Sequence, residues 1–187
     1  MKIALVVDDE PLIRCKVVEL LQNYGFDQIL EAENGQEAVL LAVAHKPVLI
    51  VMDVTMPVMN GITAAKKIGI EAPAPIVLLT ANADSETVSQ AREAGVMNYL
   101  LKPFRDEQLF PAVELAMHQF MAATTLRDQV QKLEDTLETR KLVDKAKGVL
   151  MGTGLNESDA YRKMQKMAMS KRKTLKEVAE AILLMAE

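Results

Sequence analysis

The sequence is poor in the residue types that most often carry catalysis or bind transition metals. Its 187 residues include one cysteine, two histidines and no tryptophan. A single cysteine cannot form a disulfide within the chain, which suits a reducing cytoplasm. His45 and His118 stand alone near the ends of expected helices, so we interpret them as capping or surface groups and not as metal ligands. Cys15 has apolar neighbours on an expected helix and is predicted to lie in the core.

Long apolar runs are also absent. No apolar run approaches the ~20 residues that a membrane span needs. The first run, residues 3–7, is short and is followed by acids, unlike the apolar segment of a signal peptide. We therefore expect a cytoplasmic protein that makes no use of a membrane.

The apolar residues that are present alternate between two patterns. Short runs typical of strands lie at residues 2–7, 28–33, 47–53, 75–81 and 97–104. Segments with helical spacing lie at residues 11–24, 35–45, 62–68, 85–95 and from 106 onward. The first, third and fourth runs are apolar throughout, as in parallel strands covered on both faces. Residues 1–118 are predicted to form an α/β domain with a doubly wound, five-stranded parallel sheet.

Polar residues stand where the expected strands end. Asp8 and Asp9 end the first strand, Asp53 the third and Thr80 the fourth, and Lys102 follows the fifth. Ligands of a parallel α/β sheet bind at the carboxyl ends of its strands. Three carboxylates at one edge repel one another and need a cation. Oxygen ligands without histidine or cysteine suit Mg²⁺.

These segments resemble the receiver domain of bacterial two-component response regulators. The resemblance rests on VVDDEP at 6–11, VMDVTMPVMNG at 51–61, LLTA at 78–81 and YLLKPF at 99–104. It implies a flavodoxin-like fold and a signalling regulator that is not an enzyme, apart from slow self-dephosphorylation. A sensor histidine kinase would supply the phosphoryl group. A degenerate receiver, which keeps the fold without phosphorylation, is the alternative.

The resemblance also implies a role for each residue at the strand ends. Asp53 would be the phosphoacceptor. Mg²⁺ would be held by Asp8, Asp9, Asp53 and the backbone carbonyl of Thr55. Thr80 and Lys102 would contact the phosphoryl group, and Tyr99 would be the switch aromatic. One departure is Asn60, where the family commonly has Asp; it lies outside the ligand set.

The last helix of this domain has no clear end. Residues 118–140 contain neither glycine nor proline. Apolar residues recur there at 4-3-4 spacing: Leu126, Val130, Leu133 and Leu137. This spacing predicts a coiled-coil seam of about two heptads. A helix packed on its own domain would show the same pattern. We assign residues 119–140 to a coiled-coil linker helix.

Residues 141–187 show three stretches with helical spacing and are predicted to form a small all-α domain. Thr174 and Glu177 fit a capping box at the start of the third. Residues 140–176 hold 11 Lys and Arg against three Asp and Glu, whereas residues 1–139 hold 11 against 20. A basic segment in an acidic protein points weakly to a polyanionic partner, although a solvated helix face would look the same.

This region resembles the ANTAR domain, the RNA-binding output of transcription antitermination regulators. The matching stretches are RKLVDKAKGVLM at 140–151, GLNESDAYRKMQKMAM at 154–169 and TLKEVAEAIL at 174–183. The resemblance implies a homodimer on phosphorylation, in which each ANTAR domain binds an RNA stem-loop in a leader transcript. DNA binding through a helix-turn-helix is disfavoured, because the third stretch has acids outward and no base after Lys176. A regulator that acts through DNA binding or through protein contact alone remains the alternative.

The candidate RNA contacts are the bases on the first two of these helices. We expect Lys147, Arg162 and Lys166 to contact RNA, supported by Arg140, Lys141 and Lys145. A mid-helix glycine, Gly148, costs about 1 kcal/mol relative to alanine, so another helix or a phosphate backbone is expected to approach there. Tyr161, the only aromatic residue of this region, falls on the apolar face and is predicted to be core.

Overall fold

The computed structural model describes residues 2–82 and 84–185. The chain forms two compact units, Met1–Thr124 and Thr125–Glu187. Within the described residues, no helix combines the length and apolar character that crossing a membrane requires.

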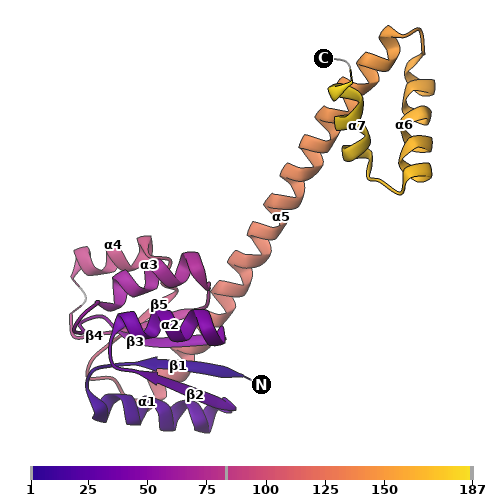
Figure 1. Ribbon diagram of the computed structural model, residues 1–187. Coiled ribbons are helices and arrows are strands. Elements are labelled where there is room, and N and C mark those ends of the chain that lie inside the picture. The colour runs from indigo at the N-terminus through magenta and orange to yellow at the C-terminus, as the bar shows by residue number, and fades with distance from the viewer. Residues whose placement is uncertain (1, 83, 186–187) are drawn as a thin grey trace. The chain divides into compact units, whose positions relative to one another are not determined.

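The first unit is built on a five-stranded sheet (Figure 1). Its strands are β1 (Ile3–Val7), β2 (Gln28–Ala32), β3 (Leu49–Asp53), β4 (Ile76–Thr80) and β5 (Asn98–Leu101). All neighbouring strands are parallel, in the order β2-β1-β3-β4-β5. This is the flavodoxin-like strand order, so the prediction of a doubly wound parallel sheet is confirmed.

Helices cover both faces of this sheet. They are α1 (Pro11–Tyr24), α2 (Gly35–His45), α3 (Gly61–Glu71), α4 (Ser85–Glu93) and α5 (Asp106–Gly152). Alternate strand residues feed two apolar clusters, because successive side chains of a strand point to opposite faces. Val6 and Val51 pack with α1 and the first part of α5, whereas Leu5 and Ile50 pack with α2, α3 and α4.

Polar side chains define where several of these helices begin. Asn34, Asn60 and Asp84 precede α2, α3 and α4, and each side chain accepts a hydrogen bond from the backbone N–H three residues on. Such caps satisfy amides that have no partner within the helix. They fix the turns that carry the chain from the strand ends into the helices.

Helix α5 is continuous from Asp106 to Gly152, although Pro111 lies inside it. The predicted boundaries at residues 118 and 140 both fall within this helix. The second unit also contains α6 (Glu157–Lys171) and α7 (Leu175–Leu184). Its core includes the fully buried side chains of Ala146, Met164 and Ala179.

Capping residues begin both short helices of the second unit. The Asn156 side chain accepts from the Asp159 amide at the start of α6. Thr174 and Glu177 form the predicted capping box at the start of α7, with both reciprocal hydrogen bonds present.

Two residues predicted to be core are instead exposed. Cys15 is exposed because α1 buries the face that carries Val17 and Leu21, and Cys15 lies on the opposite side of that helix. Tyr161 is 38% exposed. It lies at the edge of the buried stripe of α6, which is centred on Ala160 and Met164. Both predictions were wrong because apolar spacing locates a helix face but not the limits of what covers it.

Candidate functional site

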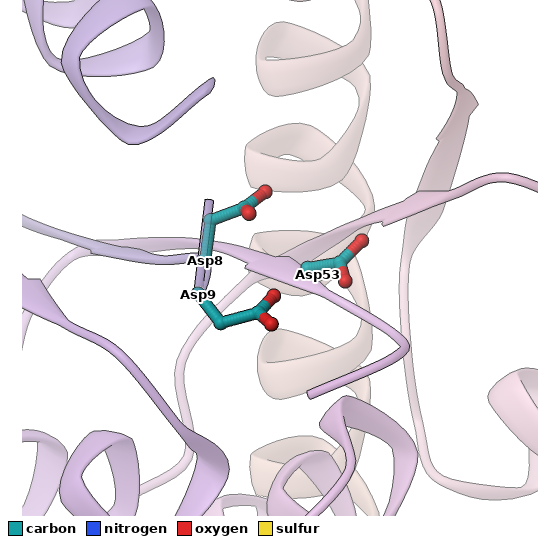
Figure 2. Close-up of side chains that lie close together, drawn as sticks. All are labelled: Asp8, Asp9 and Asp53. Carbon is teal, nitrogen blue, oxygen red and sulfur yellow. The ribbon is translucent and has the colours of Figure 1, made fainter. Parts of the chain in front are cut away.

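The carboxylates of the first unit meet at the ends of two adjacent central strands. Asp8 and Asp9 follow β1, and Asp53 is the last residue of β3. One carboxylate oxygen from each of the three residues lies within 4.8 Å of the other two. Figure 2 shows the three side chains projecting to the same side of the strand ends. Asp8 and Asp53 are buried, whereas Asp9 is exposed, so the cluster opens to solvent on one side.

Lys102 supplies the positive charge that faces this cluster. Its Nζ lies 2.8 Å from Asp8 Oδ2 and 2.9 Å from Asp53 Oδ1. Burial alone would lower the pKa of Lys102, but its hydrogen bonds to Asp8 and Asp53 outweigh burial, and the pKa lies above its ordinary value. Lys102 is therefore a fixed cation held between two carboxylates.

The environment of Asp53 favours a further cation. Burial raises the pKa of the Asp53 carboxyl above its ordinary value, and the nearby Asp8 charge adds to this rise. The hydrogen bonds from Lys102 and from the Thr55 amide, which lies 3.1 Å from Asp53 Oδ2, oppose it. One ammonium group therefore does not fully compensate three acids. Oxygen donors alone, in this number and at this spacing, fit Mg²⁺.

The loop after β3 approaches Asp53 so closely that only glycine fits at position 61. A Cβ added to Gly61 would lie 2.0 Å from the Asp53 carbonyl oxygen. The Gly61 N–H donates to the Val54 carbonyl at 2.9 Å. This contact holds the chain that follows the acceptor strand against the site. Gly61 lies within a stretch that carries the receiver resemblance, but its steric role follows only from the folded backbone.

Arg14 is a further site residue, which the sequence analysis did not identify. Its Nη1 donates to the Asp8 carbonyl at 2.8 Å, and its Nε donates to Glu31 at 2.9 Å. The side chain is largely buried and also pairs with Glu33 at the end of β2. Arg14 thus ties the backbone of Asp8 to the neighbouring strand. No local pattern marks it, because its partners are 6 to 19 residues away.

Thr80 and Tyr99 lie on the neighbouring strands, as predicted. Thr80 is buried, and its Oγ1 donates to the Asn82 carbonyl at 2.7 Å. The Tyr99 side chain is 40% exposed on β5. A cavity of about 10 Å³ lies between them, lined also by Val88 of α4. The structure thus brings the predicted strand-end residues to one edge of the sheet and leaves Tyr99 turned partly outward.

The predicted RNA-contacting bases of the second unit fall into two classes. Lys147 Nζ lies 2.8 Å from Asp144 Oδ1 and 2.9 Å from Glu157 Oε1, so this residue is neutralised by two carboxylates. The other five predicted bases are exposed and form no ion pair within the described part of the chain: Arg140, Lys141, Lys145, Arg162 and Lys166.

The environment around these bases is open. Arg162, Lys163 and Lys166 line a shallow hollow of about 480 Å³ along α6. Gly148 is exposed, and a Cβ built there would meet no atom within 4 Å. Among the described residues, no other helix therefore packs at Gly148, and the surface beside it is open.

The predicted seam is also open. Within the second unit, Leu126, Val130, Leu133 and Leu137 are 61%, 46%, 65% and 57% exposed. These four side chains lie along one stretch of α5. The other described residues of their own unit do not cover them.

Comparisons with known proteins match two separate parts of the chain to two families. Residues 4–114 match the family described as "Response regulator receiver domain", and residues 131–183 match the family described as "ANTAR domain". The chain is 48% identical over 180 residues to the transcriptional regulatory protein PdtaR of Mycobacterium tuberculosis, covering 96% of this chain and 88% of the relative. It is 37% identical over 115 residues to the chemotaxis protein CheY of Bacillus subtilis, covering 61% of this chain and 96% of CheY.

A solved structure shares the fold of the first unit. The chemotaxis response regulator CheY4 of Vibrio cholerae matches with a TM-score of 0.58 and 31% sequence identity. The match covers 62% of this chain and 98% of that one. The similarity therefore extends over the α/β unit and not over the helices that follow it.

Proposed function

Because the chain belongs to the response regulators that join a receiver domain to an ANTAR domain, we propose that it is a phosphorylation-controlled, RNA-binding antitermination factor. The observation that carries this proposal is the coexistence of a complete acidic site, held by Lys102, with exposed unpaired bases in the second unit. The receiver and ANTAR domains make the chain a signalling regulator and not an enzyme.

The first step of this function is transfer of a phosphoryl group from a sensor histidine kinase to Asp53. Its place as the last residue of β3, beside Asp8 and Asp9, supports this assignment. Mg²⁺, held by Asp8, Asp9, Asp53 and the Thr55 carbonyl, would offset the negative charge on the incoming group. Lys102 already contacts Asp53 and needs little movement to pair with a phosphoryl oxygen.

The second step is a change in the residues around the new charge. The Thr80 hydroxyl would leave the Asn82 carbonyl and donate to the phosphoryl group. Tyr99 would then turn inward beside Thr80, which requires α4 to move because the cavity there is only about 10 Å³. The phosphoryl group would thereby shift the equilibrium between two arrangements of Thr80, Tyr99 and α4.

The third step is homodimerisation through the seam of Leu126, Val130, Leu133 and Leu137. An exposed row of this kind is covered when two such helices pair. We also propose residues 1–118, 119–140 and 141–187 as receiver, linker and RNA-binding parts. The dimer would act in the cytoplasm, where nascent transcripts are made.

The final step is binding of a stem-loop in a leader transcript, which would prevent a terminator hairpin from forming. Arg162 and Lys166, supported by Arg140, Lys141 and Lys145, are the proposed contacts, because these exposed bases are not engaged with acids. Lys147 would join them only by exchanging its two carboxylate partners for RNA.

Selection of RNA by the full chain tests this function. Hairpins with a constant stem and a randomised loop are incubated with the chain, with and without acetyl phosphate and Mg²⁺. We expect enrichment of particular loops, stronger with phosphoryl donor, and lost when salt is raised. DNA hairpins of the enriched sequences serve as the control. Equal binding of DNA would favour the DNA-binding alternative, and absence of any enriched hairpin would refute RNA binding.

A further inference from the structure

The second unit contains another hollow, distinct from the one along α6 that Arg162 and Lys166 line. It has a volume of about 470 Å³ and lies among residues of α5, α6 and α7. Its lining includes Thr139, Arg140, Val143, Asp144, Tyr161 and Leu175. This volume falls within the range of about 300–1,000 Å³ found for small-ligand sites.

Tyr161 gives this hollow its distinctive chemistry. It is 38% exposed, although it was expected in the core, and it is the only aromatic residue in the second unit. Val143 and Leu175 add apolar walls. An exposed ring beside apolar walls is a surface on which a planar group can stack.

Polar groups stand at the margin of the same hollow. The side chains of Thr139 and Arg140 form no hydrogen bond within residues 2–82 and 84–185, so both have donors to offer. The Asp144 carboxylate adds an acceptor, and its pKa is held below its ordinary value by the hydrogen bond from Lys147 and by the charges of Lys147 and Arg140. The hollow therefore combines a stacking ring, side-chain donors and an ionised acceptor.

The position of the hollow favours one occupant. Arg140, an exposed base that forms no ion pair among the described residues, lines the hollow itself, and Arg162 directly follows Tyr161 on α6. A polyanion drawn to those bases would bring its own groups beside Tyr161. In such a ligand, an unpaired base is the group that fits the hollow. It is planar, it has donors and acceptors on its edge, and it can leave a stack.

We propose that this hollow, with Tyr161 as its stacking platform, receives one unpaired loop base of the bound RNA. The proposal rests on the RNA-binding function proposed above and assigns the specificity of that function to a defined pocket. Phosphate contacts through Arg162 and Lys166 hold the stem-loop in place but cannot read sequence. Stacking on Tyr161 and edge contacts to Thr139, Arg140 or Asp144 would select the base.

The absence of tryptophan from the chain permits a direct test. In Tyr161→Trp, a stacking ring is kept and becomes the only tryptophan of the protein. Met169→Trp is the matched control, because Met169 lies on the same helix, is 80% exposed and does not line the hollow. Both full-length variants are titrated with a hairpin enriched by the wild-type chain from the constant-stem library, and tryptophan emission is followed.

We expect quenching at position 161 and none at position 169. Tyr161→Ala should bind the same hairpin about 5- to 150-fold more weakly, as loss of one stacked base predicts. Its affinity should keep the wild-type dependence on salt, whereas Arg162→Ala should lower the slope by about one. Circular dichroism melting checks that each variant is folded. If Tyr161→Ala is unfolded, the emission of Tyr161→Trp alone tests the pocket.

The outcomes separate this proposal from the function on which it rests. If the wild-type chain binds a hairpin but the emission of Tyr161→Trp is unchanged, or if folded Tyr161→Ala binds as tightly as wild type, the pocket is refuted and RNA binding stands. If the wild-type chain enriches no hairpin, RNA binding and the pocket both fall.

Discussion

The open seam on α5 permits a quantitative prediction. Leu133 is 65% exposed and lies in the middle of the four seam residues. In a symmetric pair of helices, residue 133 of one chain lies close to residue 133 of the other. Leu133→Lys would therefore remove two buried leucines and place two like charges in an apolar contact.

The magnitude follows from the exposed fraction. Full burial of a leucine is worth about 1.5–3 kcal/mol, so covering a side chain that is 65% exposed contributes about 1–2 kcal/mol. Two chains lose about 2–4 kcal/mol in the dimer, which weakens association by about 30- to 1,000-fold before any charge repulsion is counted. The lysines add to this loss, because burying an unpaired charge is costly.

Sedimentation velocity measures this effect over a concentration series, with acetyl phosphate and Mg²⁺ present. Wild type should shift to dimer as concentration rises, and Leu133→Lys should remain monomeric over the same range. Leu40→Lys is a matched control, because Leu40 is also 65% exposed but lies on α2. Phosphorylation is checked by intact mass in all three. If phosphorylated Leu133→Lys dimerises like wild type, the seam is not the dimer contact.

Four further predictions concern the two units separately. Asp53→Asn should take up no phosphoryl group from acetyl phosphate and Mg²⁺ by intact mass, whereas wild type gains one; equal uptake would refute the assignment. Lys102→Gln should destabilise the chain by about 3–5 kcal/mol in chemical denaturation, because it leaves buried carboxylates without their cation, and added Mg²⁺ should recover part of the loss. Thr174→Ala should cost about 1 kcal/mol through loss of a helix cap, with Thr174→Ser close to wild type. The Lys173 hydrogen bond, with those of Thr174, lowers the pKa of Glu177 to about 2, so the stabilisation from these contacts should be complete above pH 4.5 and fade as pH falls toward 2.

The sheet and its acidic site could be predicted because the strand topology determines where the acidic residues lie. Apolar runs mark the strands, and parallel strands direct their carboxyl ends to one edge. Asp8 and Asp53 are 45 residues apart in sequence but stand at the carboxyl ends of adjacent strands. The location of the last residue of each run is therefore enough to predict the cluster.

Other parts of the site depended on contacts that no local pattern encodes. Arg14 reaches the Asp8 carbonyl only because α1 folds back along β1 and β2. Gly61 is required because its backbone lies against Asp53, a proximity set by the whole loop between β3 and α3. In α6, Tyr161 could not be separated from core residues by spacing, because exposure at the edge of a stripe depends on the neighbouring helices.

The charge pattern of residues 140–176 shows most clearly that sequence alone does not identify which charged residues are paired in the folded chain. A count of bases treats Lys147 and Arg162 alike, but folding places Lys147 against Asp144 and Glu157 and leaves Arg162 unpaired among the described residues. Lys147 links α5 to the first turn of α6, so its removal would alter the stability of the unit as well as any contact with RNA. Within residues 2–82 and 84–185, Arg162 has no such structural partner. A loss of affinity in Arg162→Ala would therefore report contact with RNA, whereas the same loss in Lys147→Ala could come from a displaced α6.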